Sequence, residues 1–388
     1  MNKKIYISFL CLFLILAMLL MLINCFPKTI SVSADVIDSS AVSAVVIEQN
    51  SLRVLSEKNC NTKLPMASTT KIMTALIALE NCNNLDEVFD VDNRASGIEG
   101  TSIYLQKNER LCMRDLLYGL MLASGNDAAC AIAYKVGNGS METFVTLMNK
   151  KAEELGLTNT HFDNPHGLDS KNHYTSAYDL AVITANAMKN ETFKEIVSTK
   201  VKQIAGNDKV ASRYVRNKHK LIGVMEGCNG IKTGFTDNAR RCCVTSVKRG
   251  EMSLICVVLN CQDMFNESER ILTECFNTYS YECVLQPYYM LNSIKVENGV
   301  ADKVKIYTQK ACFYPLKEEE KDKITFEMEV VTELTAPVNK EENVGILKVY
   351  LDNNLIFSEN IYTMENIKEK GVTDKIKDIA EKWYYGNA

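Results

Sequence analysis

Residues 65–74 read PMASTTKIMT, a stretch in which a serine and a lysine stand three positions apart, Ser68 and Lys71. Apolar residues recur at helical spacing in the segment that follows, which predicts a helix over residues 68–80. Side chains three apart share one helical face, so the Lys71 amine is expected beside the Ser68 hydroxyl. A lysine with a lowered pKa can activate a serine, and a helix N-terminus presents free N–H groups to a developing oxyanion. On its own, the pattern fits a helix-capping serine and an exposed lysine equally well.

Two further short motifs follow along the chain. Ser124-Gly125-Asn126 comes directly after an apolar segment, residues 113–123, that is predicted to be helical. Lys232-Thr233-Gly234 enters a predicted strand. Each also has a purely structural interpretation, a glycine that ends a helix for the first and an edge strand with a glycine bulge for the second.

Together, and in the order SxxK, SxN and KTG, the three motifs are typical of penicillin-recognising serine acyltransferases. The sequence resembles the D-alanyl-D-alanine carboxypeptidases among the low-molecular-weight penicillin-binding proteins. The resemblance covers about residues 41–283 and, more loosely, the C-terminal region. Its segments beyond the first motif are residues 122–128, 164–168, 230–236 and 334–338. It implies a β-lactamase/transpeptidase-like domain, an antiparallel sheet flanked by a cluster of helices.

The resemblance also implies catalytic roles. Ser68 would attack the carbonyl carbon between the two D-alanines, and Lys71 would take the serine proton. Ser124 would relay a proton to the leaving amine. Asn126 would hold Lys71 and the substrate amide. Water would then release the acyl chain, whereas β-lactams would acylate the same serine and leave slowly.

Binding residues follow from the same resemblance. Lys232 would keep the pocket positive and, with Thr233, receive the terminal carboxylate of the substrate. Gly234 would leave room for the substrate against its strand. The oxyanion hole would use the backbone N–H groups of Ser68 and Phe235.

Two positions depart from the family's pattern. Asn229-Gly230 stands where the family often has Asp-Gly, and Arg240-Arg241 follows Ala239 where it often has glycine. The two arginines would alter a turn or add cations near the mouth of the cleft. These departures concern fine substrate preference rather than the nucleophile.

Four histidines lie between the second and third motifs, namely His161, His166, His173 and His219. None belongs to a zinc-ligand pattern such as HExxH, so we expect no metal and no other cofactor. The family pattern places His166 in a structural loop near the cleft, as a buried and hydrogen-bonded residue.

The segments around the motifs predict one α+β domain over residues 35–285. Strands are expected near both of its ends, so that one sheet draws strands from both. The expected strands are residues 41–48, 52–55, 225–235, 242–248 and 252–260. Besides the two helices given above, helices are expected over residues 128–136, 141–155, 176–188 and 267–281.

Short alternating strands dominate after this domain and predict a β-rich accessory domain over residues 286–365. Residues 366–388 are expected to form an amphipathic helix whose apolar face includes Val372, Ile376 and Trp383. That face either packs on the β-rich domain or lies on a membrane surface as a peripheral anchor.

Residues 1–34 have the features of an export leader. Two lysines precede an uncharged apolar run from Ile5 to Phe26, and small residues end at Ala34. The run is also long enough to span a bilayer, so the leader is either a cleaved signal peptide or a retained anchor. A lipoprotein site at Cys25 fits poorly because of the size of Asn24. Each interpretation places the rest of the chain outside the cytoplasm, in the cell wall or at the outer face of the membrane.

Composition argues against two other classes of protein. The net charge is −4 with no basic stripe, which speaks against a nucleic-acid partner. The fourteen cysteines include no CxxC pair, so a zinc ribbon is not expected. Several lie in apolar runs, which predicts mostly buried thiols, with a disulfide such as Cys275–Cys283 left open.

The sequence therefore predicts an enzyme that hydrolyses the terminal D-Ala-D-Ala bond of the peptidoglycan pentapeptide in cell-wall remodelling. A DD-endopeptidase on the same fold is the runner-up. A β-lactamase is disfavoured because no ExxLN-like segment lies between the second and third motifs. A wall-binding protein without catalysis is disfavoured because every motif residue is present.

Overall fold

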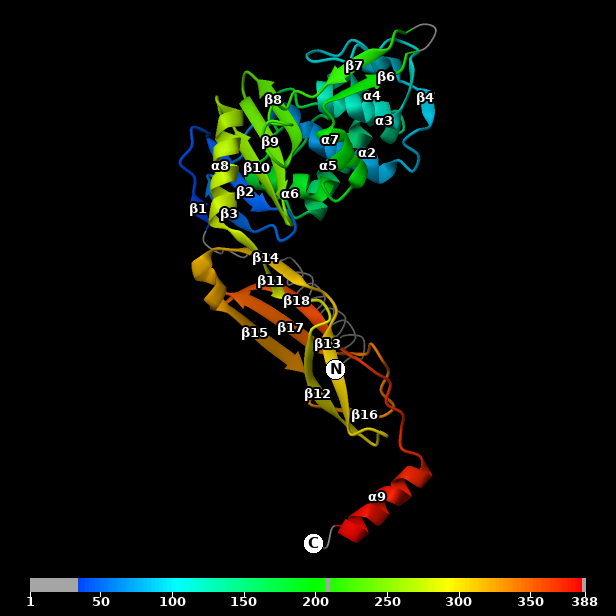
Figure 1. Cartoon of the computed structure of the whole chain (residues 1–388). Helices are drawn as coiled ribbons and strands as arrows, with labels where there is room; N and C mark the ends of the chain where they lie inside the picture. Colours follow the sequence, from blue (N-terminus) through cyan, green and yellow to red (C-terminus); the bar gives the residue numbers. More distant parts are fainter. Residues whose placement is uncertain (1–33, 207–209, 386–388) are drawn as a thin grey trace, which may run out of the picture. The chain divides into compact units, whose positions relative to one another are not determined.

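The computed structural model describes residues 34–206 and 210–385. All of the expected leader except Ala34 lies outside these residues. The described chain forms two compact units, the first ending at Thr278 and the second beginning at Tyr279 (Figure 1). Within these two ranges, no helix has the length and apolar character needed to cross a membrane.

A six-stranded sheet forms the centre of the first unit, in the order β1-β3-β2-β10-β9-β8. Its strands are β1 (Asp35–Val36), β2 (Ser43–Glu48), β3 (Val54–Lys58), β8 (Cys228–Thr236), β9 (Arg240–Arg249) and β10 (Met252–Leu259). Neighbours are antiparallel except for the short parallel pair β1–β3. The central strands β2 and β10 are buried along their whole length, which explains their mostly apolar sequences. The predicted α+β architecture, with strands from both ends of the domain in one sheet, is confirmed.

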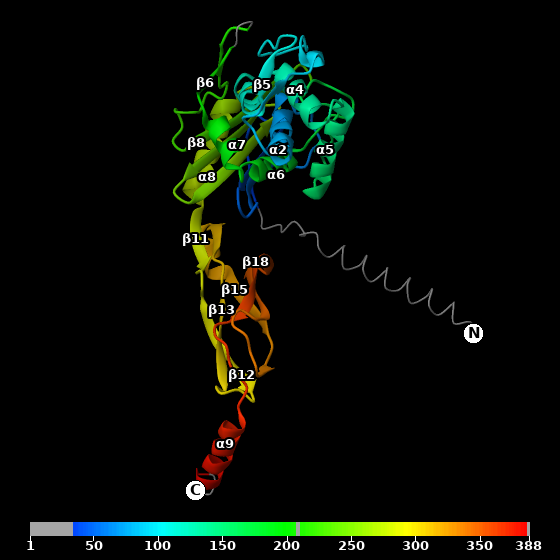
Figure 2. The ribbon, with the colours of Figure 1, turned by 90° about the vertical axis from the view of Figure 1, so that its right-hand side faces the viewer.

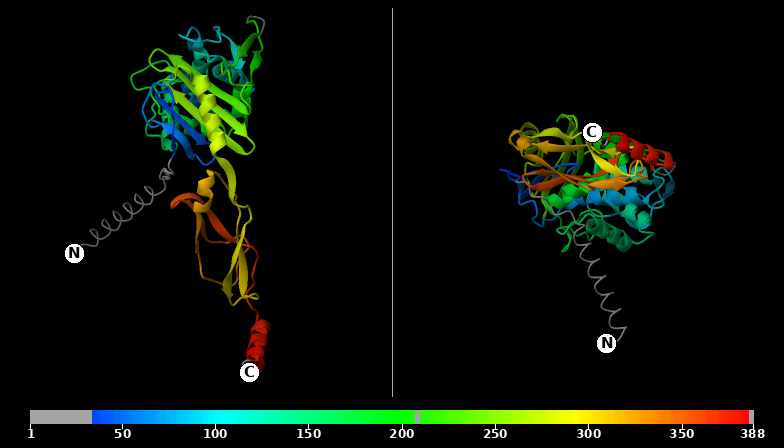
Figure 3. Two further views of the ribbon diagram at one scale, coloured as in Figure 1. Left: turned by 60° about the vertical axis from the view of Figure 1, so that its left-hand side comes forward. Right: turned by 90° about the horizontal axis from the view of Figure 1, so that it is seen from below.

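Helices cover both faces of this sheet. They are α2 (Lys71–Asn81), α3 (Met113–Tyr118), the π-helical turn η3 (Gly119–Ala123), α4 (Asn126–Val136), α5 (Met141–Glu154), α6 (Ala177–Ala187), α7 (Glu191–Ser198) and α8 (Met264–Thr278). Helix α8 lies across one face, against β9 and β10 (Figure 3). On the other face α6 packs against β2 and β10, and α2 contacts α4, α5 and α6 (Figure 2). Ser140, Ser176 and Asn190 cap the N-termini of α5, α6 and α7 with side-chain oxygens.

Two small hairpins and helix α7 were not expected from the sequence. One hairpin pairs β4 (Val88–Asp90) with β5 (Arg110–Cys112), and the other pairs β6 (Val201–Ile204) with β7 (Arg213–Arg216). Their strands have only three or four residues, too few for a clear alternation of apolar and polar positions.

The second unit is β-rich, as predicted. A six-stranded sheet has the order β15-β17-β18-β13-β12-β16, and β11 pairs with β14. The strands are β11 (Ser280–Leu285), β12 (Met290–Glu297), β13 (Lys303–Thr308), β14 (Cys312–Leu316), β15 (Ile324–Val330), β16 (Glu333–Thr335), β17 (Asn343–Leu351) and β18 (Asn354–Thr363). The expected boundary after residue 285 falls at the end of β11, whereas the structure divides the chain before β11 because that strand pairs with β14.

Helix α9 (Val372–Tyr385) ends the described chain. Its apolar side chains are exposed, with Ile376 at 60%, Ile379 at 68% and Trp383 at 83% of their full accessible area. The interpretation in which this face packs on the β-rich domain is therefore wrong for this structure.

Cysteine side chains in the described residues are present as thiols, twelve in all. Most are buried, and burial raises the pKa of Cys242 and of Cys243 to about 12, so both thiols stay protonated. These residues behave as small apolar side chains of the core, as their sequence context predicted.

Two glycines of the first unit, both with positive φ, differ in the space that a side chain would have. Gly167 (φ +90°) has no space for a side chain, because a Cβ there would lie 1.9 Å from the carbonyl oxygen of Ala67. Gly156 (φ +72°), after α5, has nothing within 4 Å of the same position.

We expect Gly156→Ala to cost about 1 kcal/mol of unfolding free energy for the left-handed conformation alone. Gly167→Ala should cost more than about 3 kcal/mol, since backbone must also move. Urea unfolding of the two variants measures this difference, and equal losses would contradict it.

Candidate active site

Ser68 lies on a 3₁₀ turn, Ala67–Thr70, and Lys71 is the first residue of α2. The predicted helix over residues 68–80 thus begins three residues later as an α-helix. The reason is local: the Thr69 hydroxyl donates to the Met66 carbonyl at 2.6 Å, and the Thr70 hydroxyl donates to the Ala67 carbonyl at 2.8 Å. Such side-chain bonds to nearby carbonyls compete with the regular helical ladder. Ser68 is partly exposed on this turn, as a nucleophile must be.

A buried histidine supports the turn from behind. His173 Nδ1 accepts the Asp163 N–H at 3.0 Å, so its proton is on Nε2, which lies 2.7 Å from the Thr70 hydroxyl. The Thr70 hydroxyl in turn donates to the carbonyl oxygen of Ala67, a residue with φ +48°. Burial lowers the pKa of His173 to about 4, so the ring is neutral at pH 7. Sequence analysis gave this residue no role, because nothing in the chain marks it as a neighbour of Thr70.

Lys71 is the centre of the site. Its side chain is fully buried, and Nζ lies 2.9 Å from Ser68 Oγ, 2.7 Å from Asn126 Oδ1 and 2.5 Å from the His166 carbonyl oxygen. Burial, followed by the positive charge of Lys232, holds the pKa of Lys71 well below its usual range. A neutral amine has two N–H groups and one lone pair. When it donates to Asn126 and His166, the lone pair is left for the Ser68 proton.

Asn126 begins α4 and is held by the loop at residues 99–105. Its Nδ2 donates to the Glu99 carbonyl and its backbone N–H to the Thr101 carbonyl, both at 2.7 Å. A Cβ on Gly100 would lie 2.7 Å from Asn126 Nδ2, so only glycine permits this approach. The amide oxygen is thereby directed at Lys71.

Asp127 organises the same loop, and the sequence analysis missed it. Its buried carboxylate accepts the Ser102 hydroxyl at 2.6 Å, the Ile103 N–H at 3.0 Å and the Leu105 N–H at 2.9 Å. An aspartate directly after SxN, in the first turn of a helix, was the available signal.

Ser124 lies between η3 and α4 with φ +67° and is nearly fully buried. Through the residues that the structure describes, no hydrogen bond joins its hydroxyl to Ser68 or Lys71. The structure therefore brings Ser68, Lys71 and Asn126 into one hydrogen-bonded group, and Ser124 stands outside that group.

Strand β8 carries the third motif on the free edge of the sheet. Lys232 is almost fully buried, and its Nζ donates to the Thr233 carbonyl at 2.8 Å. Burial and then the charge of Lys218 lower the pKa of Lys232 to about 7. Thr233 is half-buried and Phe235 is 57% exposed, so both are accessible along the edge.

Gly234 joins this strand to the nucleophile. A Cβ there would lie 2.9 Å from both the backbone nitrogen of Ser68 and the Cβ of Ala67. That Gly234 also leaves room for substrate stays a prediction, and the structure adds a further role for this glycine. Its missing side chain makes room for the turn that carries Ser68, and so brings the Ser68 N–H up to β8.

Arg240 and Arg241 are exposed at the beginning of β9. In the antiparallel register Arg240 lies opposite Thr236, and Arg241 lies opposite Phe235. Arg240 has φ +55°, and the Thr236 hydroxyl donates to Asp169 at 2.9 Å. The pair places two exposed cationic side chains at this end of β8, and its expected effect on the turn stays a prediction.

His166 is half-buried, and its Nδ1 accepts the Leu168 N–H at 3.2 Å. Burial, followed by the charge of Lys71, lowers its pKa to about 3. Its contribution to the site is its backbone carbonyl, which holds Lys71. In the described parts of the chain, no three His, Cys, Asp or Glu side chains are grouped so that they could hold a metal ion.

Comparisons with known proteins cover both units of the chain. Residues 28–263 match the model of the peptidase family S11, D-alanyl-D-alanine carboxypeptidase, and residues 284–369 match the C-terminal domain of penicillin-binding protein 5. The D-alanyl-D-alanine carboxypeptidase DacF of Bacillus subtilis is 31% identical over 88% of this chain and 90% of its own length. DacC of Escherichia coli is 30% identical over 91% of this chain and 92% of its own.

A solved structure, penicillin-binding protein 5 of Haemophilus influenzae, superposes with a TM-score of 0.71 at 26% identity. The superposition covers 88% of this chain and 99% of the Haemophilus influenzae chain. The family model spans more than half of this chain, and the relatives extend over both units. The chain therefore belongs to the serine-type D-alanyl-D-alanine carboxypeptidases of peptidase family S11, the low-molecular-weight penicillin-binding proteins.

Proposed function

We propose that this protein removes the terminal D-alanine from peptidoglycan pentapeptides, with Ser68 as the nucleophile and Lys71 as its base. One observation carries the assignment of roles: a fully buried lysine amine with a strongly lowered pKa lies 2.9 Å from a partly exposed serine hydroxyl. A serine alone is a poor nucleophile at neutral pH, and a neutral amine at this distance can take its proton.

Acylation begins with transfer of the Ser68 proton to Lys71 and attack of Oγ on the carbonyl carbon of the penultimate D-alanine. The carbonyl oxygen becomes negative and is stabilised by the N–H groups of Ser68 and Phe235. The close approach enforced by Gly234 supports this pairing of donors. Ser124 relays a proton to the amine of the departing D-alanine, and water then hydrolyses the acyl-enzyme.

Substrate binds along β8. An extended peptide can add to the free edge of a sheet through backbone hydrogen bonds. The charged form of Lys232, together with Thr233, receives the terminal carboxylate. A β-lactam presents a carboxylate and a strained amide to the same groups and acylates Ser68. No feature of the site favours endopeptidase or β-lactamase activity over this reaction.

Substitution of the nucleophile gives the first test. We expect residues 35–388 to be labelled by fluorescent penicillin and to release D-alanine from diacetyl-Lys-D-Ala-D-Ala. The Ser68→Ala variant should show neither penicillin labelling nor D-alanine release. Thr146→Ala, at an exposed position on α5, should keep labelling because its hydroxyl only bonds the Glu142 carbonyl. Labelling of the Ser68→Ala protein would refute the assignment of the nucleophile.

The pH dependence of kcat/KM tests Lys232. Its pKa of about 7 means that the ammonium is present below that pH and lost above it. Since the substrate carboxylate needs the charged form, kcat/KM should fall as pH rises through about 7. In Lys232→Arg this alkaline decline should disappear, because guanidinium stays charged. Thermal unfolding checks that the variant is folded. A wild-type profile that stays level up to pH 9 would argue against the role.

We further propose that the protein works at the outer face of the cytoplasmic membrane. The apolar leader in the sequence supports export, and the exposed apolar face of α9 supports peripheral attachment. Trp383 lies on that face, beside the exposed Tyr384.

Trp383 is the only tryptophan in the sequence, so its fluorescence reports on α9 alone. We expect a blue shift when residues 35–388 meet vesicles that contain anionic lipid. The double variant Ile376→Asp/Ile379→Asp should remove the shift, whereas Val224→Asp, 75% exposed in the first unit, should not. An unshifted spectrum for the unmodified protein would eliminate the anchor.

A further inference from the structure

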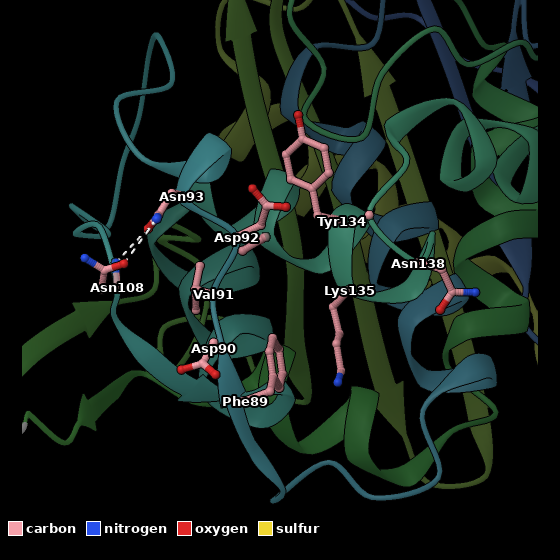
Figure 4. Close-up of a pocket in the computed structure, with 11 residues that line it drawn as sticks. Phe89, Asp90, Val91, Asp92, Asn93, Asn108, Tyr134, Lys135 and Asn138 are labelled. Atoms are coloured by element: carbon pink, nitrogen blue, oxygen red, sulfur yellow. Dashed lines mark hydrogen bonds between the residues drawn. The ribbon is translucent and has the colours of Figure 1, made fainter.

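A second hollow lies in the first unit, away from Ser68. It measures roughly 570 Å³ and lies between the β4 region and the second half of α4 (Figure 4). Its lining combines two aromatic side chains, Phe89 and Tyr134, with three amides, Asn93, Asn108 and Asn138. The two rings are half-buried and the three amides are exposed. No step of the reaction described above uses these residues.

Most charges around the hollow are paired, and Lys135, which also lines it, has its Nζ 4.5 Å from the centre of the Phe89 ring. Asp90 pairs with Arg110 at 3.4 Å, and Asp92 pairs with Arg94 at 2.6 Å. Arg94 also lies over the ring of Tyr134 at 4.1 Å and donates to the Gly139 carbonyl at 2.8 Å. The lining therefore mixes both signs, with Asp90 and Asp92 beside Lys135, which disfavours phosphate and other strongly charged groups.

Its chemistry suits a neutral sugar. Aromatic rings can pack against the C–H faces of a pyranose, and side-chain amides both donate to and accept from hydroxyl and acetamido groups. Asn93 Nδ2 donates to Asn108 Oδ1 at 3.2 Å, and the Asn108 N–H donates to Asn93 Oδ1 at 2.6 Å. These two bonds hold the amides in place before any ligand arrives.

The hollow and the Ser68 site lie along the same helix and the same loop. Helix α4 starts at Asn126, in the site, and its eleven residues reach about 15 Å to the hollow. One loop also links the two places, since Asn93 and Asn108 flank it and its carbonyls at Glu99 and Thr101 hold Asn126. A five-residue stem peptide spans about 17 Å when extended. Its D-alanine end and its sugar end are therefore about as far apart as the two sites.

We propose that this hollow binds the glycan strand of the substrate, an N-acetylated aminosugar polymer, while the stem peptide of the same strand occupies the Ser68 site. The inference rests on the proposed function, which supplies a peptide joined to sugar. The strand is neutral where a stem peptide is attached, because the lactyl carboxyl is then part of an amide bond. The hollow thereby favours polymeric wall over free peptide.

The test compares two substrates that carry the same pentapeptide, one free and one attached to a soluble glycan of several disaccharides. Phe89→Leu removes a ring and keeps an apolar side chain, and Asn138→Gly removes an amide at φ +52°. For the double variant we expect KM to rise about fivefold on the glycan-linked substrate, the usual effect of a lost hydrogen bond. Kinetics on the free pentapeptide and penicillin acylation should not change. Asn353→Gly, at φ +64° in the second unit, is the matched control.

Binding is measured separately with the hexamer of N-acetylglucosamine, titrated into the ¹⁵N-labelled protein. Amide shifts at residues 89–93 and 138 that vanish in the double variant would support the proposal. An unchanged KM on the glycan-linked substrate, or an equal loss on both substrates, would overturn it. So would shifts produced by a stem peptide without sugar in place of the hexamer. If the wild type releases D-alanine from neither substrate, the proposed function falls, and the titration alone then decides the glycan site.

Discussion

Burial of the Lys71 amine is the constraint on which the first unit depends. An ammonium out of contact with water is costly, and a lysine in such a place lowers its pKa and becomes neutral. Acceptors at 2.7 Å and 2.5 Å, from Asn126 and the His166 carbonyl, leave its lone pair for the nearby Ser68 hydroxyl. Asn126 and His166 come from two segments far from Lys71 in the sequence. The base therefore exists only when the helices and the loop around it are packed.

Much of the remaining structure keeps these partners in place. His173 and Thr70 hold the turn behind Ser68, and Asp127 holds the loop that fixes Asn126. Gly167 and Gly234 allow the turn to approach a loop on one side and β8 on the other. None of these residues needs to touch substrate. A substitution at any of them would act by moving Ser68 or Lys71, so its effect on catalysis should follow its effect on local packing.

The basic side chains around the site differ in their pKa values and in their exposure. Burial and the charge of Lys232 hold the pKa of Lys71 well below its usual range, Lys232 changes its charge near pH 7, and Arg240 and Arg241 are exposed at the end of β8. The base therefore depends on the carboxylate-binding lysine, whereas the pKa of Lys232 is lowered by burial and by Lys218. This coupling allows one lysine to act as a base while another, in the same pocket, still binds an anion near neutrality.

Local sequence was sufficient for most of the elements and for the identity of the reactive residues. Helical spacing and alternation located α2, α4, α5, α6, β9, β10 and the β-rich character of the second unit, because long periodic segments carry a strong local signal. The order SxxK, SxN, KTG pointed to the chemistry, because each motif is contiguous. The short strands β4 to β7 and the early end of the domain at Thr278 depended on pairing between segments, which no local pattern contains.

Only the tertiary structure decided how the reactive residues work together. The steric role of Gly234 and the support from His173 and Asp127 involve residues far apart in sequence. The exposed face of α9 is a further case, since amphipathic spacing predicts an apolar face and not what covers it. Periodicity is a property of neighbours along the chain. Burial, pKa and contact distance are properties of neighbours in space, and these appear only once the chain is folded.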